Sequence, residues 1–105
     1  MLIGAPAICT RRIQALIADE HYRLLQLDLV AQPDVGKVIP QSGGLRKLRW
    51  SLSGQGKRGG IRVIYYLSAS RETILMLFVS AKNEQDDLTR QQLKTLRKIR
   101  EEEYQ

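Results

Sequence analysis

The basic residues of this chain are concentrated in a stretch without acids. Thirty-seven residues between Asp34 and Glu72 contain no aspartate or glutamate, yet they hold eight of the seventeen lysines and arginines. The chain as a whole has a formal net charge of +6. Folded surfaces usually mix both signs of charge, so this stretch predicts one positive face and an anionic partner. The alternative is a solvated face kept for solubility. The eight residues are Lys37, Arg46, Lys47, Arg49, Lys57, Arg58, Arg62 and Arg71.

This size and charge suit a nucleic-acid-binding module or a small nuclease, and cleavage of RNA without a metal ion would set three requirements for such a cluster. The ribose 2′-OH attacks the adjacent phosphorus, which requires a base, charge stabilisation at the phosphorane and an acid for the leaving 5′-oxygen. A histidine pair is excluded because His21 is the only histidine. Arginine stays protonated and suits phosphate oxygens, whereas lysine can lose its proton when cations crowd it or it is partly buried.

Length and composition exclude several other classes. With 105 residues, 43% of them hydrophobic and 27% charged, we expect one globular domain over residues 1–105, too small for a TIM barrel. The single cysteine, Cys9, can form neither an intramolecular disulfide nor a multi-cysteine zinc site. With no signal peptide and no apolar run of membrane length, we expect a cytoplasmic protein, and we expect no cofactor.

A helical hairpin is predicted ahead of the basic stretch. Apolar residues at helical spacing predict helices over about Ile8–Ile17 and Asp19–Ala31. Asp19 is the expected N-cap of the second helix, and Pro33 is expected to close it. A short strand is expected near Leu2–Ala5.

After the hairpin, the hydrophobic period changes to two. From Leu45 onward, apolar residues alternate with basic ones, which predicts a strand that places Lys47 and Arg49 on one face. A glycine-rich loop, Ser53–Gly60, separates it from two apolar runs, Ile61–Leu67 and Thr73–Ala81, which are typical of central strands covered on both faces.

A final helix is expected to begin near Asp87, with Leu93, Leu96 and Ile99 on its buried stripe. The predicted fold class is therefore α+β. Two N-terminal helices pack on a small, mostly antiparallel sheet of three or four strands, and a C-terminal helix follows.

Three segments, in order, resemble the RelE/ParE superfamily of bacterial toxins and, within it, the HigB-type branch. They are Gly43–Arg49 (GGLRKLR), Gly56–Tyr66 (GKRGGIRVIYY) and Ala81–Leu88 (AKNEQDDL). The resemblance covers about Tyr22 to Leu96 and implies a RelE-like fold. It also implies an mRNA interferase, the toxin of a type II toxin–antitoxin pair, which cuts mRNA in the A site of a translating ribosome. The implied partners are mRNA, the ribosome and a cognate helix-turn-helix antitoxin of the HigA type.

The resemblance also indicates which cations act. Arg62 matches the position that holds the scissile phosphate in family members, and Lys82 matches a basic position at the edge of the site. Lys57 and Arg58, in the glycine-rich loop, complete the catalytic candidates. The candidate RNA-binding residues are Lys47, Arg49, Arg46 and Asn83.

Three other functions remain open. A ParE-like toxin that acts on DNA gyrase would share the fold but lack the catalytic cations. A non-catalytic RNA- or ribosome-binding module would be explained by charge alone. A metal nuclease would use Glu84, Asp86 and Asp87, although these carboxylates are more simply interpreted as capping the last helix.

Overall fold

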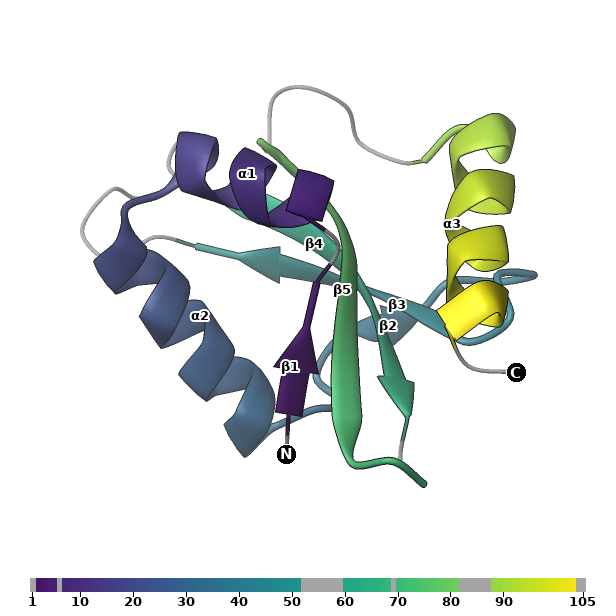
Figure 1. Ribbon diagram of the computed structural model, residues 1–105, viewed down its shortest axis with the longest axis horizontal. Helices are drawn as coiled ribbons and strands as arrows, with labels where there is room; N and C mark the ends of the chain where they lie inside the picture. Colours follow the sequence, from purple (N-terminus) through teal and green to yellow (C-terminus); the bar gives the residue numbers. More distant parts are fainter. Residues whose placement is uncertain (1, 6, 52–59, 69, 82–87, 104–105) are drawn as a thin grey trace.

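A computed structural model describes residues 2–5, 7–51, 60–68, 70–81 and 88–103. Its five strands form one sheet in the order β1-β5-β4-β3-β2, antiparallel except for the parallel β1–β5 pair (Figure 1). The α+β prediction is thus confirmed. In chain order the elements are β1 (Leu2–Gly4), α1 (Ala7–Leu16), α2 (Asp19–Ala31), β2 (Lys37–Val38), β3 (Leu45–Trp50), β4 (Ile61–Ser68), β5 (Thr73–Ala81) and α3 (Arg90–Glu103).

Helices α1 and α2 pack together on one face of the sheet. Ile13 of α1 and Leu25 and Leu29 of α2 are fully buried against Val63 and Tyr65 of β4. The hairpin prediction is confirmed, and α2 has the predicted bounds. This layer leaves the opposite sheet face to α3 (Figure 1).

The predicted N-cap of α2 is wrong by one residue. Ala18 occupies the N-cap and makes no side-chain capping hydrogen bond. Asp19 is instead the first helical residue, followed by Glu20. Both carboxylates lie in the first turn, where the positive end of the helix dipole favours negative charge.

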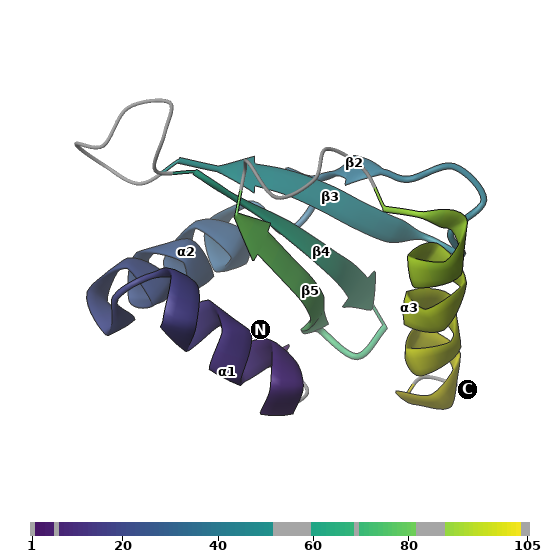
Figure 2. The same cartoon turned by 90° about the horizontal axis from the view of Figure 1, so that it is seen from above.

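Helix α3 covers part of the other sheet face, at one end of the strands (Figure 2). Its buried residue Leu96 lies in a cluster with Leu45 and Ile64. The helix begins at Arg90, later than expected, because a capping box sets its start. Thr89 Oγ1 accepts a hydrogen bond from Gln92 N at 3.1 Å, and Gln92 Oε1 accepts one from Thr89 N at 3.0 Å.

The sheet has one strand more than the three or four predicted. Strand β2 is two residues long, too short for alternation to reveal it. It forms because Ser42 closes the turn before β3: its Oγ donates to Ile39 O at 2.6 Å and accepts from Leu45 N at 2.9 Å. Gly43 and Gly44 then adopt positive φ angles, 76° and 97°, which glycine tolerates without strain.

None of the helices in the described ranges is both long and apolar enough to cross a membrane.

Candidate active site

Four basic side chains gather on the sheet face that α3 covers in part. They are Lys37 of β2, Lys47 and Arg49 of β3, and Arg62 of β4, together called the basic face. Arg49 lies directly opposite Arg62 in the β3–β4 ladder, and Lys37 lies opposite Lys47 in the β2–β3 ladder. Opposed residues project from the same face with Cβ atoms about 4.5–5.5 Å apart. Three predicted residues, Lys47, Arg49 and Arg62, are therefore brought together.

The side chains of the basic face differ in their exposure to solvent. Lys37 and Arg49 are exposed, Lys47 is half-buried, and Arg62 is only 5% exposed. On the β5 side, Arg62 lies opposite Ser80, which is also buried. Arg62 and Arg49 lie opposite each other, and like charges repel across strands. A phosphate would relieve that repulsion, and each guanidinium fork matches its oxygens.

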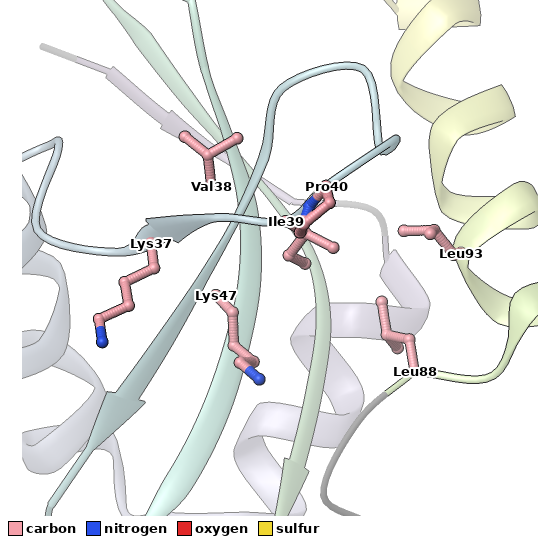
Figure 3. Close-up of a pocket in the computed structure, with 7 residues that line it drawn as sticks. All are labelled: Lys37, Val38, Ile39, Pro40, Lys47, Leu88 and Leu93. Carbon is pink, nitrogen blue, oxygen red and sulfur yellow. The ribbon is translucent and has the colours of Figure 1, made fainter.

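A hollow of about 430 Å³ adjoins the two lysines of the basic face. Figure 3 shows the side chains of Lys37 and Lys47 at one side of it, with Leu88 and Leu93 projecting from the α3 side. Val38, Ile39 and Pro40 complete the apolar lining. Cations beside apolar walls suit a nucleotide, which carries a charged phosphate and a flat base.

The connection from α2 to β2 is held by Tyr65, on the sheet face that α1 and α2 cover. The buried Tyr65 hydroxyl accepts a hydrogen bond from Gly36 N at 2.8 Å and donates one to Pro33 O at 2.8 Å. Burial raises the pKa of Tyr65 above its ordinary value, so the hydroxyl stays protonated, and remains a donor, to higher pH than an exposed tyrosine. Since Lys37 directly follows Gly36, this contact positions Lys37 beside Lys47.

Arg46 is not brought to the basic face. It lies opposite Tyr65 in the β3–β4 ladder, on the side that α1 and α2 cover. Its Nη1 donates to Gly36 O at 2.8 Å and to Asp34 O at 3.2 Å. In this structure Arg46 holds the α2–β2 connection.

Four predicted residues lie outside the described residues: Lys57, Arg58, Lys82 and Asn83. Their roles stay predictions. The carboxylates Glu84, Asp86 and Asp87 also lie outside the described ranges, within which no three His, Cys, Asp or Glu side chains are grouped so as to hold a metal ion.

Lys37 joins the predicted residues on the basic face, whereas Tyr66 makes a structural contact with α3. Lys37 was not singled out, because only the pairing of β2 with β3 brings it to Lys47. Tyr66 has the same strand parity as Arg62, but Arg100 of α3 engages its ring: the guanidinium carbon lies 4.4 Å from the ring centroid, and Nη2 donates to the hydroxyl at 2.9 Å. Tyr66 therefore anchors α3 to the sheet.

Comparison with protein families identifies the group to which this arrangement belongs. The model for the RelE toxin of the RelE/RelB toxin–antitoxin system matches residues 31–104, which include the whole basic face and α3. The chain belongs to this family. The RelE/ParE-superfamily toxin expected from the sequence is thereby confirmed.

Solved structures of E. coli RelE share the fold of this RelE-family chain. A double mutant of that toxin in the free state has a TM-score of 0.62 at 10% identity, covering 94% of this chain and 95% of that one. The isolated toxin has a TM-score of 0.55 at 12% identity, with coverages of 93% and 97%. The intact E. coli RelBE toxin–antitoxin complex has a TM-score of 0.57 at 12% identity, with coverages of 76% and 94%. The predicted RelE-like fold is confirmed.

Proposed function

We propose that this RelE-family chain is a ribosome-dependent, metal-independent endoribonuclease that cuts mRNA in the ribosomal A site and so inhibits translation in the cytoplasm. The observation that carries the proposal is the convergence of Lys47, Arg49 and Arg62 on one sheet face, with the two guanidinium groups on opposed residues. Membership of a toxin family supports it.

In the proposed reaction, a base takes the proton of the ribose 2′-OH as its oxygen bonds to phosphorus. The bond from phosphorus to the 5′-oxygen breaks, and an acid protonates that oxygen. The products are a 2′,3′-cyclic phosphate and a 5′-hydroxyl end.

Three residues of the basic face have proposed roles in this reaction: Lys47, Arg49 and Arg62. Arg62 and Arg49 hold the non-bridging oxygens and stabilise the charge that develops on the phosphorane. The burial of Arg62 makes its attraction for an anion stronger than that of an exposed arginine. Lys47 is a candidate for proton transfer. Lys57, Arg58 and Lys82 remain proposed catalytic groups, and Asn83 a proposed RNA-binding one.

We expect cleavage to depend on the ribosome. A site that lacks histidine needs the 2′-oxygen, the phosphorus and the leaving oxygen to be held in line, and a ribosome that fixes the mRNA can supply this alignment. Purified protein alone should therefore cut naked RNA poorly.

The proposed regulatory partner is a cognate helix-turn-helix antitoxin of the HigA type. A toxin that cuts mRNA needs an inhibitor in the cell that makes it. The E. coli toxin with the same fold has been solved in complex with its antitoxin. The net charge of +6 favours a partner with an acidic contact surface.

Primer extension on an actively translated mRNA tests the proposal. Wild type should produce cleavage ends inside codons. Arg62→Ala should cleave at least about a hundredfold more slowly, as expected when one donor to the developing charge is removed. Arg23→Ala, an exposed substitution on α2, is the matched control and should cleave normally. Both variants should unfold cooperatively.

No cleavage by wild type that still binds ribosomes would contradict the enzyme and favour a binding module. Inhibition of gyrase supercoiling by wild type would favour the ParE-like alternative.

A further inference from the structure

The outer face of α3 carries a second group of cations. Arg90, Lys94 and Arg97 are exposed and spaced at four and three residues, so they lie along one side of the helix. Together with Gln41 and Leu93, they line a hollow of about 500 Å³. Gln41 belongs to the turn between β2 and β3, so this hollow lies between the turn and the helix. These three cations are called the α3 cation stripe.

The α3 cation stripe is continuous with the basic face. Leu93 lines both this hollow and the hollow beside Lys37 and Lys47. In Figure 3, Leu93 projects from α3 toward Ile39 and Pro40. The hollow beside the α3 cation stripe therefore adjoins the hollow beside the basic face, with Leu93 between them.

These cations contribute little to the stability of the fold. Arg90 is the first residue of α3, whose first turn contains no acid, and a positive charge there opposes the helix dipole. Arg97 pairs with Glu101 at 3.3 Å, but both side chains are about half exposed, and such pairs contribute little to stability.

We propose that the α3 cation stripe binds the phosphate backbone of the mRNA strand that flanks the scissile linkage. This proposal rests on the proposed function and names a second binding segment for the same substrate. The occupant is the mRNA strand because the stripe continues from the basic face and because its cations match a backbone with one charge per nucleotide. Such contacts hold the register of the strand without reading its sequence.

Fluorescence anisotropy with non-cleavable RNA tests the stripe separately from catalysis. The probes are single strands of about three and about twelve nucleotides, within and beyond the span of one small binding site, with every 2′-OH methylated. The variant is Arg90→Gln/Lys94→Gln. The matched control, Arg11→Gln/Arg23→Gln, removes the same charge from exposed positions on α1 and α2, on the other side of the sheet.

For the longer strand, the slope of log affinity against log salt should be shallower in the α3 variant than in the control by about 1.4, or roughly 0.7 for each lost phosphate contact. For the shorter strand, the two variants should have equal slopes. Cleavage by Arg62→Ala is measured in a different assay, so failure of catalysis is distinguishable from failure of the stripe.

Equal slopes for the two variants on the longer strand would overturn the proposal, as would failure of wild type to bind that strand at low salt. An effect of the α3 variant on binding to mRNA-free ribosomes, without one on the longer strand, would also overturn it and assign the stripe to ribosomal RNA.

Discussion

Replacing Tyr65 by Phe removes the hydroxyl oxygen that bonds to Gly36 N and Pro33 O in the α2–β2 connection. The ring is fully buried, so its packing stays the same. The change leaves the buried Gly36 N–H without its acceptor, which costs about 1–3 kcal/mol, and Pro33 O without a donor, which costs about 0.5–1.5 kcal/mol. We therefore expect Tyr65→Phe to lower the free energy of unfolding by roughly 1.5–4.5 kcal/mol.

Urea denaturation measures this loss, and Tyr66→Phe provides the control. The Tyr66 hydroxyl accepts one hydrogen bond from Arg100, and that guanidinium still stacks on the ring after the oxygen is removed. Because Tyr66 is only half-buried, water can replace part of the lost contact, so Tyr66→Phe should cost less than Tyr65→Phe. A Tyr65→Phe variant as stable as Tyr66→Phe would refute the reasoning that the hydroxyl of Tyr65 holds the connection.

Two further predictions concern the rest of the fold. Burial raises the pKa of the Cys9 thiol from 9.0 to about 11. As pH rises, the unfolded chain therefore loses this proton at a lower pH than the folded chain, which favours unfolding. From pH 9 to 11, wild type should lose roughly 2–3 kcal/mol of unfolding free energy relative to Cys9→Ala, and parallel pH profiles would contradict this. Thr89→Ala removes the capping box of α3 and should cost about 1 kcal/mol in urea denaturation. Thr95→Ala, within the same helix, should cost less, and the reverse order would show that the cap is not what starts α3.

The sequence was informative where a periodic pattern extends over several turns or residues. Apolar spacing predicted α2, Asp19 and Pro33 set its expected ends, and the apolar runs located β4 and β5. Alternation in β3 placed Lys47 and Arg49 on one face. The same alternation places Arg46 on the other face, although its charge and its position beside Lys47 had suggested a shared role.

What the sequence did not predict depends on pairing between distant residues. The register that sets Arg49 opposite Arg62 is a property of the β3–β4 ladder and cannot be read from either strand alone. Lys37 was missed because a two-residue strand has no period. The start of α3 was placed too early because Asp86 and Asp87 suggested a cap, whereas Thr89 and Gln92 form it.

The central claim is that Arg49 and Arg62 act on one phosphodiester. A double-mutant cycle on the single-turnover rate of cleavage of translated mRNA tests it most directly. We predict that Arg49→Ala and Arg62→Ala each slow cleavage, by about 10²-fold or more for Arg62. The fold-decrease in rate of the double variant should be at least about tenfold smaller than the product of the two single fold-decreases. Losses that simply multiply would contradict the claim, because they would mean that the two guanidinium groups act independently.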